Sequence, residues 1–221
     1  KSFSKISAGA FIVADFNNGS VIAQKNQDKK MPIASISKLI TALVTLESVD
    51  QHKQITITKK MLDSGYGDYG QLRLAETLTA GELLYPLLLC SSNDAAYALA
   101  MDYGFDNFVE LMNEKAASLN LANTSFQEPS GTSPQNVSTP EDLFNLVKYL
   151  FENKRWIFDI TKLRAINQWR NNNFFAGKED YLGGKNGYID EAGETLAALF
   201  SLPLSGTEKR NIAIILLNSQ N

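Results

Sequence analysis

The sequence predicts an α/β fold in which an antiparallel sheet, built from both ends of the chain, is flanked by helices and interrupted by an all-helical insert lobe. Apolar, strand-like runs occur near residues 10–23 and again after residue 181, whereas the stretch between them has apolar residues at helical spacing. The 221 residues, 44% of them hydrophobic, suffice for a sizeable core. We expect a single domain over residues 1–221, with a sheet lobe at about 1–50 and 160–221 and a helical lobe at about 60–155.

The first predicted element is a hairpin. Residues 10–14 and 21–23 are apolar and strand-like. Between them, Asn17, Asn18 and Gly19 tolerate the positive φ of a tight turn. The chain is therefore expected to open with two antiparallel strands.

A helix is predicted after Pro32, because apolar residues recur there at helical spacing: Ile36, Leu39, Ile40, Leu43 and Leu46. Ser35 then lies near the helix N-terminus. Lys38 follows one turn later on the same face, so the two side chains are predicted to be neighbours.

A second helix is predicted from a capping box, in which Thr79 is followed three residues later by Glu82. This helix runs toward Cys90, although Pro86 should kink it or delay its start. The loop after it is predicted to hold the run Ser91, Ser92 and Asn93.

Three more helices fill the middle of the chain. Residues 94–102 and 105–119 are two of them, separated by Gly104. The third runs from 139 to about 153 and opens with an N-cap residue, a proline and two acids: Thr139, Pro140, Glu141 and Asp142. A turn-rich loop at 128–138 precedes it.

The last predicted elements are strands at residues 181–189, 195–204 and 211–217, the second and third joined by a turn at 205–207. They complete the sheet begun by the first hairpin.

Composition narrows the possible chemistry. His52 is the only histidine and Cys90 the only cysteine, so no metal site of histidine and cysteine clusters and no cofactor is expected. His52 is predicted to be a solvated loop residue. Cys90 ends an apolar run and is predicted to be a small buried hydrophobe rather than a nucleophile.

Charge and hydropathy narrow the possible partners. A net charge of −3 with scattered lysines gives no basic stripe, so we do not expect nucleic acid as a partner. No apolar run approaches the roughly 20 residues of a spanning helix, so no membrane segment is expected in this chain. The first residues contain no signal-peptide core, and we expect any export signal to have been removed or never present.

Ser35 and Lys38 suggest a serine nucleophile that uses a lysine base. A serine hydroxyl is a weak nucleophile, and a lysine activates it only when the amine is neutral. A second ammonium, from Lys185, together with partial burial, would lower the pKa of Lys38. The backbone N–H of Ser35, at a helix N-terminus, would face a developing oxyanion.

The Ser-x-x-Lys spacing alone arises often by chance. Its specificity comes from Ser91-x-Asn93, about fifty residues later, and Lys185-x-Gly187 in a predicted strand. We therefore expect these motifs to meet in one cleft between the two lobes.

With these motifs the chain resembles the low-molecular-mass penicillin-binding proteins that are serine-type D-alanyl-D-alanine carboxypeptidases, one group of the penicillin-recognising serine enzymes. The resemblance implies a β-lactamase/transpeptidase-like fold. It covers almost the whole chain and is carried by the Asn18-Gly19 hairpin, residues 32–38, residues 87–96, residues 123–126, Pro129-Ser130-Gly131, and residues 183–188 with 190–193.

The resemblance implies that Ser35 is acylated by a peptidoglycan stem peptide ending in D-Ala-D-Ala, that the terminal D-Ala leaves, and that water hydrolyses the acyl-enzyme. Lys38 would be the base. The other implied roles are a proton relay at Ser91, substrate binding at Asn93, positive potential from Lys185, and an oxyanion hole of the Ser35 and Tyr188 N–H groups. Asn186 and Gly187 would complete the substrate site. β-Lactams would acylate the same serine, and the substrate implies an extracytoplasmic location, in the periplasm or at the cell surface.

One residue departs from the family pattern, and three alternatives stay open. Asn186 stands where the family usually has a threonine or serine hydroxyl that contacts the substrate carboxylate. A D,D-endopeptidase that cuts crosslinks would use the same residues. A class A β-lactamase would need a deacylating glutamate, and neither Glu110 nor Glu128 matches its signature. A non-catalytic penicillin- or peptidoglycan-binding module would keep the cleft without turnover.

Overall fold

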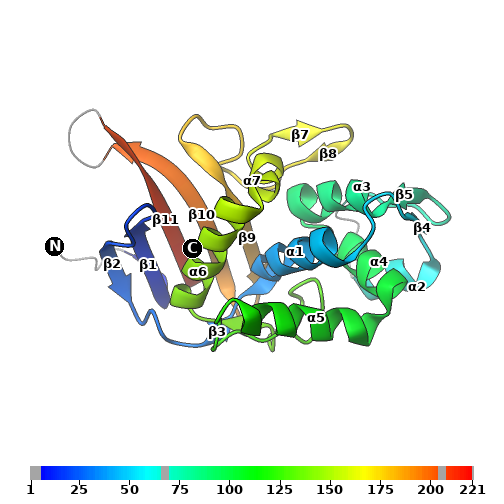
Figure 1. Cartoon of the computed structure of the whole chain (residues 1–221), viewed down its shortest axis with the longest axis horizontal. Coiled ribbons are helices and arrows are strands. Elements are labelled where there is room, and N and C mark those ends of the chain that lie inside the picture. Colours follow the sequence, from blue (N-terminus) through cyan, green and yellow to red (C-terminus); the bar gives the residue numbers. More distant parts are fainter. Residues whose placement is uncertain (1–5, 66–69, 204–207, 221) are drawn as a thin grey trace.

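The computed structural model describes residues 6–65, 70–203 and 208–220. Its central feature is a five-stranded antiparallel sheet of order β2-β1-β11-β10-β9 (Figure 1). The strands are β1 (Ala10–Asp15), β2 (Val21–Lys25), β9 (Tyr181–Ile189), β10 (Gly193–Pro203) and β11 (Lys209–Ser219). β1 pairs with β11 from Ala10 opposite Leu217 to Asp15 opposite Ile212, so both ends of the chain share one sheet, as predicted.

The segment between β2 and β9 is mainly helical. Its helices are α1 (Lys38–Ser48), α2 (Lys59–Gly65), α3 (Ala80–Tyr85), α4 (Asn93–Tyr103), α5 (Phe105–Ser118), α6 (Pro140–Asn153) and α7 (Arg155–Thr161). Three short two-stranded sheets form from segments between the helices: β3 (Met31–Pro32) with β6 (Val137–Ser138), β4 (Gln54–Thr56) with β5 (Thr77–Thr79), and β7 (Ala165–Ile166) with β8 (Trp169–Arg170). Helices α2 and α7 and these short strands were not anticipated from the sequence.

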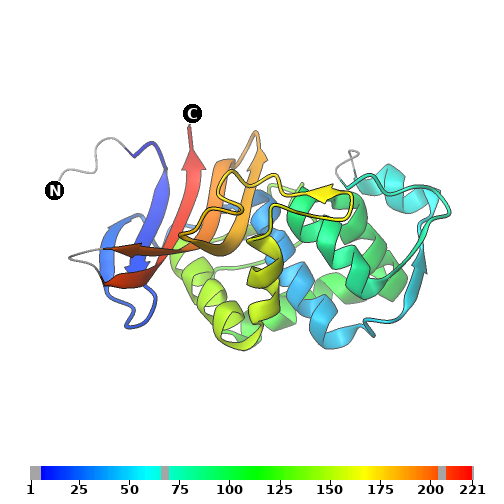
Figure 2. The same ribbon diagram turned by 90° about the horizontal axis from the view of Figure 1, so that it is seen from above.

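The helices form two groups (Figure 2). α6 packs against β1, β10 and β11, and α7 packs against β9, so these two helices cover one face of the sheet. The other helices, α1 to α5, lie beside the sheet and pack on one another. The predicted lobe boundaries remain a prediction; α6, which they assigned to the helical lobe, packs on the sheet. Within the described residues, no helix combines the length and apolarity needed to cross a membrane.

Helix α1 runs through the middle of the core. Every residue from Lys38 to Thr45 is buried, including the charged Lys38. One contiguous set of buried apolar side chains joins the sheet face at Ile12 and Ile215 to Leu39 and Leu43 of α1, and continues to Leu83 of α3. A helix buried on all sides has little freedom to shift, and so it holds its first residue firmly.

The predicted start signals act as expected. The side chain of Thr79 accepts a hydrogen bond from the Glu82 N–H, and Glu82 accepts one from the Thr79 N–H, which completes the capping box. Thr139 Oγ1 accepts from the Asp142 N–H at 3.1 Å and begins α6 at Pro140.

The segment around Pro86 differs from a simple kink. Proline has no N–H for the helical ladder, and residues Pro86–Cys90 form a wider π-helical turn whose Pro86 carbonyl accepts from the N–H groups of Ser91 and Ser92. Ser91 follows with φ +60°. Asn93, predicted in the loop, is instead the first residue of α4, capped by Ser92.

Two further expectations have different outcomes. Cys90 is only half-buried rather than buried: it lines a cleft, and its Sγ lies 3.5 Å from the Arg170 carbonyl oxygen. The predicted turn at 205–207 lies outside the described residues.

Gly184 in β9 yields a stability prediction. Its φ is +149°, and a Cβ there would lie 2.3 Å from the Ala197 carbonyl oxygen of the neighbouring strand. We expect Gly184→Ala to lower the free energy of unfolding in urea by about 3 kcal/mol, because backbone atoms must separate.

The matched control is Gly19→Ala, where φ is also positive (+72°) but the added Cβ has no neighbour within 4 Å. The Gly19→Ala substitution should lower the free energy of unfolding by only about 1 kcal/mol. Equal losses in the two variants would show that the close packing of β9 on β10 is unimportant.

Candidate active site

Ser35 lies in a tight turn rather than in the expected α-helix. Residues Ala34–Ser37 form a 3₁₀ turn that leads directly into α1. Ala34 has φ +47°, which is unfavourable for a residue with a Cβ, and Ser37 Oγ donates to the Ala34 carbonyl at 2.8 Å. A Cβ at Gly187 would lie 2.5 Å from the Ser35 nitrogen, so only glycine allows β9 to approach the turn this closely.

Lys38 is fully buried, with three oxygen atoms around its amine. Its Nζ lies 3.0 Å from Ser35 Oγ, 2.8 Å from Asn93 Oδ1 and 2.5 Å from the Ser130 carbonyl oxygen. These partners come from the turn before α1, the start of α4 and the loop before α6. The predicted contact between Ser35 and Lys38 is therefore present.

The environment of Lys38 favours a neutral amine. Burial lowers its pKa from 10.5 to about 7, and the negative charge of Glu128 opposes part of that shift. The sequence argument relied on the charge of Lys185 with only partial burial. In the structure, burial is the main cause for Lys38, because the whole side chain is inside the core.

Lys185 is buried as well, behind the cleft rather than on its surface. Its Nζ donates to the backbone carbonyl of Asn186 at 2.7 Å. Burial and, after it, the nearby charge of Lys38 hold the pKa of Lys185 well below its ordinary value. The two predicted lysines thus lie close enough to influence each other.

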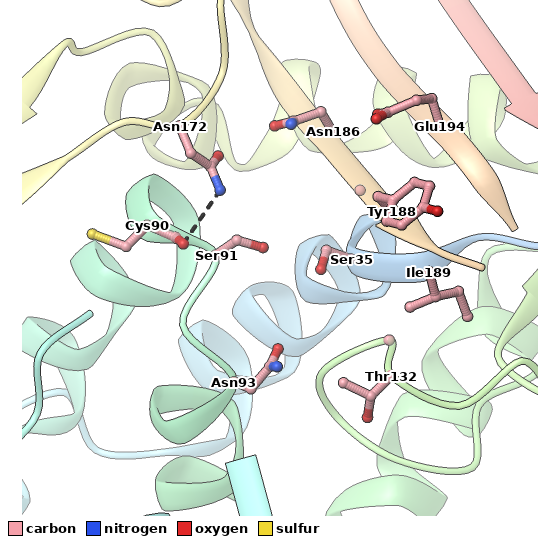
Figure 3. A pocket seen from close by; sticks show the side chains of 12 residues that line it. Ser35, Cys90, Ser91, Asn93, Thr132, Asn172, Asn186, Tyr188, Ile189 and Glu194 are labelled. Atoms are coloured by element: carbon pink, nitrogen blue, oxygen red, sulfur yellow. Dashed lines mark hydrogen bonds between the residues drawn. The ribbon is translucent and has the colours of Figure 1, made fainter. Parts of the chain in front are cut away.

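Ser91 and Asn93 approach Ser35 from the helical side. The side chain of Ser91, displayed by the left-handed residue after the π-helical turn, points toward Ser35 (Figure 3). Asn93 lies below it and binds Lys38 as described. The second and third motifs therefore flank the serine from opposite sides.

These residues open onto a cleft of about 290 Å³. Its lining combines polar side chains from both sides: Ser35, Cys90, Ser91, Asn93, Gly131, Thr132, Asn172, Asn186, Gly187, Tyr188, Ile189 and Glu194. Asn186 is half-buried in this lining, and its Oδ1 is buried and lacks a hydrogen-bond partner among the described residues. Tyr188 is 57% exposed.

Several lining residues were not anticipated. Asn172 donates to the Cys90 carbonyl at 3.3 Å and closes one wall, and Glu194 projects from β10 beside Tyr188 (Figure 3). Neither belongs to a sequence motif that could have revealed it. Ser130 was found only as part of a Pro-Ser-Gly motif, and its carbonyl contact with Lys38 could not be foreseen.

The geometry suits proton abstraction from Ser35. A neutral lysine amine has two N–H bonds and one lone pair, whereas the ammonium has three donors and none. Two of the three oxygens around Nζ, those of Asn93 and Ser130, can only accept. The neutral amine satisfies both of them and leaves its lone pair for the Ser35 hydroxyl proton.

Burial of Lys38 predicts a pH-dependent stability. Its pKa is about 7 in the folded protein and 10.5 in the unfolded chain, so between these values the unfolded chain binds more protons. Stability should therefore rise with pH in this window, by at most about 1.4 kcal/mol per pH unit.

The Lys38→Met variant tests this prediction. Methionine does not titrate, so the difference in unfolding free energy between Lys38→Met and the wild type should shift steadily in favour of the wild type above pH 7. Below pH 6.5 the difference should be constant. Urea titrations at closely spaced pH values measure it, and parallel curves across the window would contradict the burial argument.

The sequence of the chain is similar to that of known proteins. Residues 1–218 match the family described as D-alanyl-D-alanine carboxypeptidase. The D-alanyl-D-alanine endopeptidase of Escherichia coli (strain K12) is 38% identical over 148 residues, which cover 65% of this chain and 47% of that protein. The aligned part thus spans about half the length of that relative.

Solved structures of penicillin-binding enzymes have a similar fold. A mutant of the Streptomyces K15 DD-transpeptidase superposes with a TM-score of 0.86 at 26% identity, covering 98% of this chain and 92% of that one. Penicillin-binding protein D2 of Listeria monocytogenes, in its ampicillin-bound form, gives 0.83 at 29% identity, covering 98% and 91%. These similarities confirm the predicted transpeptidase-like fold. Together with the match over residues 1–218, they show that the chain belongs to the D-alanyl-D-alanine carboxypeptidase family of serine peptidases.

Proposed function

We propose that this protein is an acyl-serine D,D-peptidase of peptidoglycan, with Ser35 as nucleophile and Lys38 as its base. The observation that carries the proposal is the buried Lys38 amine, 3.0 Å from Ser35 Oγ and held by two carbonyl-type acceptors. Proton transfer to Lys38 frees the Ser35 oxygen to attack the carbonyl carbon of a D-Ala residue. The tetrahedral oxyanion is received by the N–H groups of Ser35 and Tyr188.

The remaining residues act on the leaving group and the substrate. Ser91 passes a proton to the departing amine, since its side chain faces Ser35. Asn93 orients both Lys38 and the substrate amide, and buried Lys185 supplies positive potential beneath the cleft. Water then hydrolyses the acyl-enzyme. Penicillins are expected to acylate Ser35 by the same route, and the substrate implies action outside the cytoplasm.

Within this class we propose endopeptidase activity on peptide crosslinks. The only charged side chain among the described residues on the cleft lining is a carboxylate, Glu194, and a free terminal carboxylate would be repelled by it. The family hydroxyl that contacts such a carboxylate is replaced by Asn186. Two further hollows share Glu194 with the cleft, and one of them also shares Asn186, so the cleft continues past these residues. The E. coli relative is also named an endopeptidase.

Carboxypeptidase activity on single stem peptides is the second candidate. The family description names it. Lys185, directly beneath Asn186, is the structural feature that favours it, because its positive potential attracts a carboxylate.

A comparison of two substrates tests the proposal. We expect a crosslinked muropeptide dimer to be hydrolysed with a kcat/KM at least about tenfold above that for D-Ala release from a monomeric pentapeptide, equivalent to about 1.4 kcal/mol. Chromatography of the products measures both reactions. Ser35→Ala should lose both activities and covalent labelling by fluorescent penicillin. A preference for the monomer would assign carboxypeptidase activity instead, and wild-type protein without any labelling would contradict the acyl-serine mechanism.

Asn186 provides a separate prediction. Asn186→Thr restores the hydroxyl that the family uses, and we expect it to raise kcat/KM for D-Ala release by about tenfold, the equivalent of one hydrogen bond of about 1.4 kcal/mol. Activity on the dimer should change less. Asn186→Ala is the control, since it removes the amide without adding a hydroxyl. If the threonine variant is no better than the alanine variant on the monomer, then the missing hydroxyl does not limit carboxypeptidase activity.

A further inference from the structure

Glu128 is a buried carboxylate behind the active site that the mechanism above does not use. It is 7% exposed and belongs to the loop between α5 and α6. Its Oε2 accepts from the N–H and the hydroxyl of Ser130, at 2.7 and 2.5 Å. Its Oε1 accepts from the Gly131 N–H at 2.5 Å, the Asn136 amide at 3.0 Å and the Ser133 N–H at 3.3 Å. Both oxygens are therefore surrounded by donors, which is the environment of an ionised carboxylate.

These bonds fix the loop at the point where it meets Lys38. Ser130 donates to Glu128 through both its N–H and its hydroxyl, while its carbonyl oxygen accepts from Lys38 Nζ. The orientation of this carbonyl is thus set by the carboxylate on the other side of the same residue.

Asn136 extends the contact to the turn that carries Ser35. It is fully buried, and its Nδ2 lies 3.0 Å from Ser37 Oγ, 2.9 Å from the Glu128 carbonyl and 3.0 Å from Glu128 Oε1. The Asn136 amide therefore joins the loop to the turn that carries Ser35, and the Glu128 carboxylate joins it through Ser130 to Lys38.

We propose that Glu128 is a positioning residue for Lys38, which holds the Ser130 carbonyl against the amine and places a negative charge behind it. This inference rests on the proposed role of Lys38 as base. The described charged groups that face Lys38 are Glu128, from the loop, and Lys185, from β9. The charge of Glu128 raises the pKa of Lys38, whereas burial lowers it, and the pKa that results is about 7.

The test is the pH profile of Ser35 acylation by a fluorescent penicillin in Glu128→Gln, a change that keeps the shape of the side chain. Without the charge, the acid limb of the profile should move to lower pH by roughly one unit. The maximal rate should fall roughly tenfold, because one amide group must now face N–H donors and the Ser130 carbonyl loses its fixed position.

Three variants separate charge from scaffolding. Glu128→Asp keeps the charge with a shorter reach, and Asn136→Ala weakens the loop without changing its charge; both should lower the maximal rate and leave the acid limb in place. Glu110→Gln removes an exposed carboxylate from α5 and should match the wild type. Thermal unfolding of each variant verifies that it is folded.

A second readout does not depend on acylation. The ¹³Cε resonance of Lys38, assigned by its loss in Lys38→Arg, should titrate with a lower midpoint in Glu128→Gln than in the wild type. An unchanged NMR midpoint in folded Glu128→Gln protein would overturn the proposal. Wild-type protein that penicillin fails to acylate would instead contradict the proposed function, and the NMR titration would still decide the role of Glu128.

Discussion

The amine of Lys38 is held out of water in the middle of the protein, and the rest of the site is built around this constraint. Burial that lowers a lysine pKa from 10.5 to about 7 corresponds to a penalty on the charged form on the order of 5 kcal/mol. The core of apolar side chains around α1 sustains it, since every residue of the segment Lys38–Thr45 is buried. The same burial favours the neutral amine, which is the form that the proposed role of Lys38 as base requires, because a lysine exposed to water would remain protonated.

The backbone around Lys38 adopts unfavourable conformations at the points where it presents reactive groups. Ala34 and Ser91, neither of them glycine, both have positive φ. A positive φ at a residue other than glycine typically costs about 1–3 kcal/mol of folding free energy. The first lies in the turn that carries Ser35, and the second follows the π-helical turn imposed by Pro86. The surrounding hydrogen bonds, from Ser37 to Ala34 and from Ser91 to Pro86, hold them in place.

The ionisable groups of the cleft lie at two depths. Both lysines lie beneath the lining, whereas the carboxylate of Glu194 lies on it. A substrate therefore meets the Glu194 carboxylate on the cleft lining, whereas the two lysines beneath it have lowered pKa values. Neither Asn186 nor Glu194 touches the Ser35–Lys38 pair in the described hydrogen bonds.

The sequence by itself determined the fold class, the strand and helix pattern at both ends, the helix starts at Thr79 and Thr139, and the three motifs of the site. These features depend on local periodicity, capping and spacing, which can be recognised from residues that lie near one another in the sequence. Only the tertiary structure decided how deeply Lys38 is buried, and hence that burial rather than the charge of Lys185 lowers its pKa. It also placed Cys90, Asn172 and Glu194 on the cleft and joined Glu128 through Ser130 to Lys38. Such contacts link segments far apart in the chain, and no local pattern encodes burial or the direction of a backbone carbonyl.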